Sequence, residues 1–199
     1  IPEHLRVHLA DWDGKYESCI FVDARKHDTG LVRSRIVARQ FANQAMDGLF
    51  AATPDEAVES VLLSDLASNK DHAMLIWDCT SAFLSTPLKE LVVVKPPPEL
   101  CKSEKTRAIA WKATPGLRRS SADWQDYYFD EMVASDDFER SLIEPCAMKN
   151  VKRRIKTVTH GDDTMSTGPR TELKWLEEHV PRLFDVTMQP IISLHPEDA

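Results

Sequence analysis

Three aspartates, Asp78, Asp162 and Asp163, have the kind of setting that metal-dependent nucleotidyl transfer requires. Asp78 follows an apolar run from Ala73 to Trp77, and the other two follow Gly161 between two strand-like segments. Nucleotidyl transfer needs two divalent cations held close together, one activating the attacking 3′ hydroxyl and one holding the triphosphate leaving group. Mg²⁺ takes hard oxygen ligands, usually one or two carboxylates plus phosphate and water. One aspartate at the end of an inner strand and another in an adjacent hairpin turn would meet this need.

Each of these signals also has an ordinary structural explanation. An aspartate after a strand is commonly a turn residue or a helix cap, and Gly-Asp-Asp between two strands is commonly a tight turn. Taken alone, neither signal separates a metal site from a loop. The elements that hold the aspartates therefore carry much of the interpretation.

Apolar patterns predict the elements around the aspartates. The run 73–77 is apolar enough to be an inner strand covered on both faces, and segments 155–159 and 164–167 form a predicted hairpin around the Asp pair. Other strands are expected at 16–22, 31–38, 91–94 and 184–188, the first two forming a basic hairpin. Helices are expected to begin at Thr53, acting as N-cap, and at Ser120 or Ser121, and a third is expected from about 169 to 180. This mixed order favours an α+β fold with helices packed on one face of the sheet.

The composition is that of a packed globular protein. Of the 199 residues, 42% are hydrophobic and 29% are charged, a balance typical of soluble domains. No stretch approaches the roughly 20 apolar residues that a membrane span needs. The first residues lack a secretory signal pattern, and the absence of an initial Met suggests a fragment. The four cysteines are widely spaced, which indicates reduced thiols in an intracellular protein and no zinc site.

The charge distribution limits what the chain can bind. A net charge of -7 argues against a general nucleic-acid binder, because phosphate contacts need clustered Lys and Arg. Three stretches are nevertheless locally basic, at 25–39, 102–119 and 149–156. Each of them is either a solvated surface or a contact region for a polyanion.

A series of short segments resembles one protein family. The segment 76–84, IWDCTSAFL, is similar to the first catalytic motif of copia-type (Pseudoviridae-like) retrotransposon reverse transcriptases. Six further segments lie in the order found in that family, at 34–41, 49–54, 94–97, 116–124, 138–146 and 160–163. The resemblance runs from about Phe21 to Met188.

The resemblance implies the fingers and palm portion of a polyprotein's reverse transcriptase, over residues 16–199 with an N-terminal extension at 1–15. The fingers would comprise about 16–70 and 88–115, and the palm about 71–87 and 116–199. The implied fold is α+β, with a mixed and mostly antiparallel sheet, and the thumb is absent. The implied activity is RNA-directed DNA polymerisation with two Mg²⁺ ions, for which Mn²⁺ can substitute.

The same resemblance implies partners and a location. The partners would be an RNA template, a DNA primer and deoxynucleoside triphosphates, without any membrane. The remaining polyprotein domains, namely thumb, ribonuclease H and integrase, are implied but not contained in the chain. The location would be the cytoplasm, in a virus-like particle, or the nucleus.

The resemblance also assigns roles to individual residues. Asp78 and Asp162 would be the metal ligands, and Asp163 a supporting carboxylate, because neighbours in a strand point to opposite faces. The arginines of the fingers that would meet triphosphate or template are Arg33, Arg35 and Arg39. Phe83 would lie under the incoming sugar and exclude a 2′ hydroxyl, and Gly116 would let the backbone approach the template base pair. Without the family match, Phe83 is a core residue and the arginines are a solvated hairpin face.

Several positions depart from the family pattern. Pro115 replaces an aromatic residue, Ala122 and Asp123 lie where Pro-Arg is usual, and Gly161 replaces a valine. These changes suit a truncated or decayed copy. Two alternatives therefore stay open: an inactive palm-fold remnant acting at most as a nucleic-acid-binding module, and an RNA-directed RNA polymerase, against which Phe83 argues.

Overall fold

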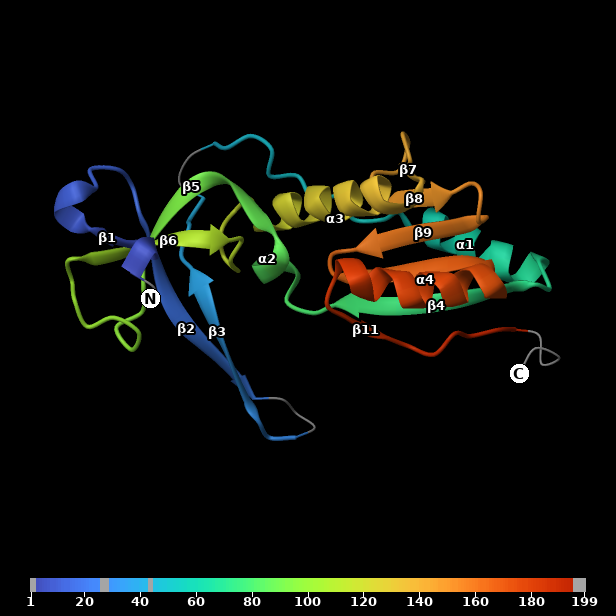
Figure 1. Ribbon diagram of the computed structural model, residues 1–199, viewed down its shortest axis with the longest axis horizontal. Helices are drawn as coiled ribbons and strands as arrows, with labels where there is room; N and C mark the ends of the chain where they lie inside the picture. The colour runs from blue at the N-terminus through green and yellow to red at the C-terminus, as the bar shows by residue number, and fades with distance from the viewer. Residues whose placement is uncertain (1–2, 26–28, 43–44, 195–199) are drawn as a thin grey trace. The chain divides into compact units, whose positions relative to one another are not determined.

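The chain forms two compact units, each assembled from two separate stretches of sequence (Figure 1). The computed structural model describes residues 3–25, 29–42 and 45–194. The first unit comprises Ile1–Leu49 and Phe83–Trp124, and the second comprises Phe50–Ala82 and Gln125–Ala199. Residues 50–70, which the sequence groups with the fingers, thus belong to the second unit. The assignment of fingers and palm to these units stays a prediction.

The first unit contains a five-stranded sheet in the order β1-β6-β5-β2-β3. Its strands are β1 (Arg6–His8), β2 (Glu17–Arg25), β3 (Val32–Ala38), β5 (Pro87–Lys95) and β6 (Thr106–Lys112). Strands β2 and β5 pair in parallel, and the other pairs are antiparallel. Two short 3-10 helices, η1 (Glu3–Leu5) and η2 (Leu9–Asp11), flank β1. The core of this unit is small and centres on Cys19, Ala38 and Leu117.

The predicted basic hairpin is confirmed as β2 and β3, which pair from Cys19 opposite Ala38 to Arg25 opposite Val32. Figure 1 shows this pair of strands reaching out from the rest of its unit. Beyond Cys19 and Ala38 nearly every residue of both strands is exposed or half-buried. Of the predicted turn, Asp28 lies outside the described residues, while Gly30 adopts a φ of 66°.

The second unit contains a six-stranded antiparallel sheet in the order β11-β4-β10-β9-β8-β7. Its strands are β4 (His72–Cys79), β7 (Phe138–Arg140), β8 (Ala147–Asn150), β9 (Ile155–His160), β10 (Asp163–Pro169) and β11 (Val186–Met188). The apolar run expected as an inner strand is β4, which lies between β11 and β10. The expected hairpin is β9 and β10.

Four α-helices occur in the described part of the chain: α1 (Glu56–Ser68), α2 (Ala82–Ser85), α3 (Ser120–Asp136) and α4 (Arg170–Leu183). In α3, Trp124, Tyr128 and Met132 are all buried, as their fourfold spacing predicts. The prediction of Thr53 as the N-cap of α1 is wrong. Asp55 takes that position, with extended backbone and a side chain that accepts from the N–H of Ala57.

The expectation that the helices pack on one face of the sheet is also wrong. On β10, Thr164 contacts the hydroxyl of Tyr128 in α3, whereas Thr167 donates to Asp65 in α1. Residues three apart in a strand point to opposite faces. Helices α1 and α3 therefore cover opposite faces, and the polar side chains on the α1 face are satisfied by Asp65, which also pairs with His72 and Lys156.

None of the helices in the described residues is long and apolar enough to cross a membrane. All four cysteines lie in this part of the chain and carry free thiols.

Candidate active site

Strand pairing brings the predicted carboxylates together at one end of the sheet of the second unit. Asp78 is the next-to-last residue of β4, and Asp163 is the first residue of β10. The two residues are direct partners in the antiparallel register. Directly opposed residues have their Cβ atoms about 4.5–5.5 Å apart and on the same face. The side chains of Asp78 and Asp163, both exposed, therefore start from neighbouring points.

Asp162 lies in the two-residue turn that joins β9 to β10. Its carbonyl oxygen accepts from the N–H of Cys79 (2.9 Å), which ties the turn to the end of β4. Gly161 has a φ of 69°, and among the described residues Asp162 is not one of those with positive φ. Positive φ at the first central position alone defines a type II′ turn, which favours glycine there. The glycine that departs from the family pattern is thus the residue this turn needs.

The reason for ranking Asp163 below Asp162 as a metal ligand does not hold in this structure. Strand alternation would put the two side chains on opposite faces, but Asp162 lies in the turn and only Asp163 lies in the strand. The register gives Asp163 the position directly across from Asp78. Which of the two carboxylates is the second ligand stays a prediction.

A fourth carboxylate, Asp185, lies beside this group and is not identified by the sequence. It directly precedes β11, which pairs with β4 on the side away from β10. The carbonyl oxygen of Asp185 accepts from the N–H of Thr80 (2.8 Å), just beyond Asp78. Its side chain is exposed. Asp78, Asp162, Asp163 and Asp185 thus lie at the ends of three neighbouring strands, at the same end of the sheet.

The pKa of the Cys79 thiol reflects the negative charge at this end of the sheet. Burial raises its pKa, and the negative charges of all four carboxylates raise it further, to about 12. The thiol therefore stays protonated near neutral pH and is a poor nucleophile. The same charges make this end of the sheet attractive to cations.

The carboxylates fit a divalent cation that takes part of its ligand shell from elsewhere. Among the residues that the structure describes, no group of three or more His, Cys, Asp and Glu side chains is arranged to hold a metal on its own. Mg²⁺ is usually held by one or two carboxylates together with substrate phosphates and water. Exposed oxygen donors on adjacent strands suit that mode of binding rather than a closed structural site.

Phe83 and Gly116 belong to the first unit. Phe83 is half-buried in α2, and its role at the sugar stays a prediction. Gly116 has a φ of 87°, and a Cβ there would lie 2.0 Å from the carbonyl oxygen of Ala38. Close packing of Gly116 against the end of β3 therefore explains why glycine is needed at this position. A template contact at Gly116 also stays a prediction.

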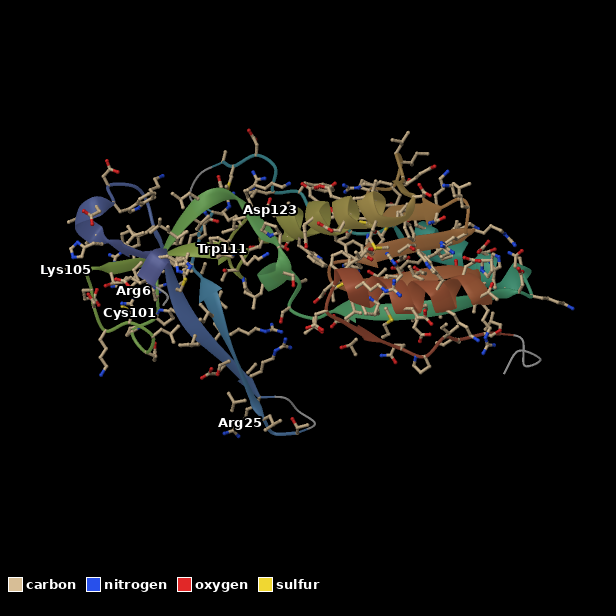
Figure 2. All side chains as sticks on the ribbon, viewed as in Figure 1. Arg6, Arg25, Cys101, Lys105, Trp111 and Asp123 are labelled. Atoms are coloured by element: carbon tan, nitrogen blue, oxygen red, sulfur yellow. The ribbon has the colours of Figure 1, made fainter. Side chains whose placement is uncertain are left out.

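The departures next to Gly116 are accommodated within the first unit. The Pro115 carbonyl accepts from the N–H of Ala38 (2.8 Å), and Ala122 is buried. Asp123, labelled in Figure 2, is buried and pairs with Arg119 at 3.2 Å. These positions therefore have structural roles of their own.

Comparison with known proteins finds similarity to transposon polyproteins. No family model matches it. It is 28% identical over 134 residues to the Gag-Pol polyprotein of transposon Ty1-NL2 from Saccharomyces cerevisiae, covering 66% of this chain and 8% of that protein. It is 25% identical over 163 residues to the Ty1-DR5 Gag-Pol polyprotein of the same yeast, covering 75% of this chain and 9% of that protein.

This similarity supports a retrotransposon origin. The chain spans less than a tenth of the length of these Ty1 polyproteins.

The basic stretches of this Ty1-related chain differ in how their charges are used. In the stretch 149–156 every Lys and Arg pairs with its own carboxylate; the pairs are Lys149–Glu139, Lys152–Asp137, Arg153–Glu172, Arg154–Asp71 and Lys156–Asp65. This stretch is neutralised within the fold. It is therefore a poor surface for a polyanion.

The hairpin arginines are placed differently. Arg33 and Arg35 lie opposite Ala24 and Val22, so both point to the same face of β2 and β3, and both are exposed. Within the described ranges neither has a carboxylate partner. Arg39 follows β3 and its Nε donates to the Ser18 hydroxyl (2.9 Å). Figure 2 shows Arg25 near the far end of the same hairpin, and the register places it on the face opposite Arg33 and Arg35.

Proposed function

We propose that this chain is the fingers and palm portion of a copia-type retrotransposon reverse transcriptase, and that it catalyses RNA-directed DNA synthesis. The observation that carries the proposal is the pairing of Asp78 with Asp163, with Asp162 in the adjoining turn. Two strands that are distant in sequence end side by side in carboxylates, as a two-cation site requires. The similarity to Ty1 polyproteins supports the same origin.

Asp78 and Asp162, with Asp163 beside them, are the residues that would hold two Mg²⁺ or Mn²⁺ ions. When bound, these ions activate the primer hydroxyl and neutralise the charge that develops on the triphosphate. Positioning accounts for most of the catalysis in phosphoryl transfer, so rigid strand ends suit this task.

Arg33 and Arg35 would attract the polyanionic partners. They are exposed, unpaired within the described residues, and share one face. An RNA template, a DNA primer and deoxynucleoside triphosphates all present phosphates that such guanidinium groups bind. The net charge of -7 limits this attraction to a few basic positions.

Primer extension tests the proposal directly. The purified chain is incubated with a primed RNA template, deoxynucleotides and Mg²⁺, and extension is compared with that of three variants. Asp78→Asn and Asp162→Asn are expected to lose extension by at least about a hundredfold, because the reacting groups lose their alignment. Asp130→Asn, which changes an exposed aspartate of α3 in the same unit, is the matched control and should extend normally.

The outcome also separates the alternatives. Binding of primer-template without extension would support an inactive palm-fold remnant. Extension with ribonucleotides in preference to deoxynucleotides would support an RNA polymerase. Full activity in Asp78→Asn would exclude the carboxylate site altogether.

A further inference from the structure

We infer that Tyr128, on α3, is a positioning residue that fixes the strand ends carrying the four carboxylates, an inference that rests on the proposed function. The side chain of Tyr128 is fully buried in the second unit, next to the sheet end where those carboxylates emerge. Its partners include the immediate neighbours of the carboxylates in sequence. Tyr128 is thus placed to act on the carboxylates through the residues beside them.

The hydroxyl of Tyr128 bonds to β10 and is linked through Thr164 to β9. Thr164 Oγ1 lies 3.3 Å from Tyr128 Oη and 3.3 Å from Thr159 Oγ1. Thr164 directly follows Asp163 in β10, and Thr159 lies across from it in β9. Both threonines are buried, so each hydroxyl depends on this small network for its hydrogen bonds. The network holds the base of the β9–β10 turn.

The same side chain lies near Cys79, the last residue of β4. Burial, and to a lesser extent the nearby Cys79 thiol, raise the pKa of Tyr128, against the hydrogen-bonding influence of Thr164 and Thr159. Trp77 Nε1 is buried and has no hydrogen-bond partner among the described residues. Trp77 and Cys79 flank Asp78, and strand alternation puts both on the face opposite its carboxylate. Tyr128 therefore lies on the side of the sheet opposite the Asp78 carboxylate, the side that Trp77 and Cys79 face.

The ring of Tyr128 reaches the third strand end. Its centroid is 5.0 Å from that of Phe184, the residue directly before Asp185, with the rings tilted by 32°. Phe184 is buried. One side chain thus contacts the chain neighbours of Asp163 and of Asp185, and it lies close enough to Cys79, the chain neighbour of Asp78, for the thiol to affect its pKa. A metal site held by separate strand ends needs such a shared support to keep its oxygen donors at fixed separations.

Tyr128→Phe removes the hydroxyl and keeps the ring, so it tests the inference with little change in packing. The matched control is Ser166→Ala, which removes a buried hydroxyl from a similar bond between β10 and β9, Ser166 to Thr157 at 2.6 Å. Ser166 lies farther along β10 from the carboxylates. Thr164→Val is a second variant that breaks the Tyr128 bond from the other side.

The first measurement is hydrogen exchange at two backbone amides of the full chain. The N–H groups of Cys79 and Thr80 bond to Asp162 and Asp185 and so report whether the strand ends stay joined. In Tyr128→Phe and Thr164→Val these amides should exchange roughly fivefold faster or more. Ser166→Ala should leave them close to the wild-type rate. Unchanged exchange in both Tyr128→Phe and Thr164→Val, or equal acceleration in Ser166→Ala, would overturn the inference.

The second measurement is the binding of Mn²⁺ alone, followed by electron paramagnetic resonance. Tyr128→Phe should weaken binding several-fold, less than the roughly 10- to 100-fold decrease seen when a direct partner of a metal ligand is removed. Ser166→Ala should not weaken it, and equal affinities in Tyr128→Phe and wild type would count against the inference. If wild type binds no Mn²⁺ that Asp78→Asn abolishes, the proposed function fails, and the exchange rates still decide whether Tyr128 fixes the strand ends.

Discussion

Gly116 and Gly161 both adopt positive φ, but only at Gly116 does a backbone atom occupy the place of a Cβ. At Gly161 nothing lies within 4 Å of that position, whereas at Gly116 the Ala38 carbonyl lies 2.0 Å away. A non-glycine residue in this backbone region costs about 1–2 kcal/mol by itself. Replacing Gly161 therefore measures the free-energy cost of the backbone conformation alone. Replacing Gly116 adds the cost of a steric clash with Ala38.

We expect Gly161→Ala to lower the free energy of unfolding by about 1–2 kcal/mol and Gly116→Ala by about 3 kcal/mol or more, because the chain must also move away from β3. Urea titrations followed by circular dichroism measure both changes. Equal losses in the two variants would mean that Gly116 and Ala38 are not in close contact.

Phe83 provides a second prediction at the level of one side chain. If it excludes a 2′ hydroxyl, as the family resemblance implies, Phe83→Ala should raise ribonucleotide incorporation relative to deoxynucleotide incorporation. Single-nucleotide extension assays measure this ratio. Phe50→Ala, which removes an exposed ring, is the control. An unchanged ratio in Phe83→Ala would leave Phe83 as a packing residue of α2.

The sequence identifies most of the acidic cluster, but not all of it. Asp78, Asp162 and Asp163 can be found because a strand end and a hairpin turn are local patterns. Asp185 cannot, because its place depends on β11 pairing with β4, and strand order is a long-range property that local patterns do not encode. Alternation likewise fails to rank the Asp162-Asp163 pair, since it applies within a strand and not across a turn.

At the level of elements, the hairpin of β2 and β3 and the segment from β8 to β9 are both basic in sequence but different in the fold. We expect Arg33→Gln with Arg35→Gln to weaken primer-template binding and to reduce its salt dependence. Removing one Arg–phosphate interaction makes the slope of log affinity against log salt shallower by roughly 0.7–0.9. Filter-binding titrations at several salt concentrations measure both quantities.

The control for this prediction is Lys149→Gln with Lys152→Gln. These lysines pair with Glu139 and Asp137, so their replacement should leave the affinity and its salt slope nearly unchanged. A larger effect from the lysine pair than from the arginine pair would place the nucleic-acid surface in the second unit.

Helix α1 is held to the sheet by a polar contact that responds to acid. Burial raises the pKa of Asp65, but hydrogen bonds and charge from Lys156 and His72 outweigh it and lower the pKa overall. A carboxylate with a lowered folded-state pKa contributes stability above its ordinary pKa of about 3.9. That contribution is lost as the pH falls through the folded-state pKa.

Asp65→Asn should therefore reduce the free energy of unfolding by about 1–3 kcal/mol at pH 7, and the difference from wild type should shrink as the pH falls below about 4. Urea titrations across this range measure it. Asp71→Asn is the control, because Asp71 forms an exposed pair with Arg154 that contributes little. A difference that stays constant with pH would show that the charge of Asp65 is not what stabilises the contact.

The elements themselves follow from the sequence more completely than their packing does. The strands β4, β9 and β10 and the buried face of α3 agree with apolar spacing. The placement of helices on both faces of the sheet does not follow from it. In β10, Thr164, Ser166 and Thr167 are all buried, so polar residues face the core on both sides of the strand. The sequence of β10 therefore does not show that both of its faces are covered. Thr53 and Asp55 are both residues that favour the N-cap position, so the sequence alone does not choose between them, and in the structure Asp55 caps α1.

Across the whole molecule, the large buried side chains are concentrated in one unit. Among the described residues, the twelve largest fully buried side chains include Trp77, Tyr128, Phe129 and Phe138, and all twelve belong to the second unit. The core of the first unit consists of smaller groups around Cys19, Ala38 and Leu117. Burial of apolar surface is the main source of stability.

We therefore expect the first unit to open at lower free energy than the second. In native-state hydrogen exchange, amides of β2 and β3 should lose protection at lower urea concentrations than amides of β4, β9 and β10. Coincident exchange across both units would mean that they unfold as one cooperative body.

The interleaving of the two units along the chain bears on how the protein is made. Strand β4 is complete at Cys79, but its inner partner β10 begins only at Asp163. Synthesis proceeds at roughly 5–20 residues per second. On a ribosome, the apolar residues of β4 are therefore synthesised several seconds before β10, the strand that pairs with them. Pairing between segments this distant is slow and leaves strands open to association with other chains. The nascent chain is thus most vulnerable to aggregation while the segment between β4 and β10 is being translated, and a chaperone acting in that interval would have its greatest effect on yield.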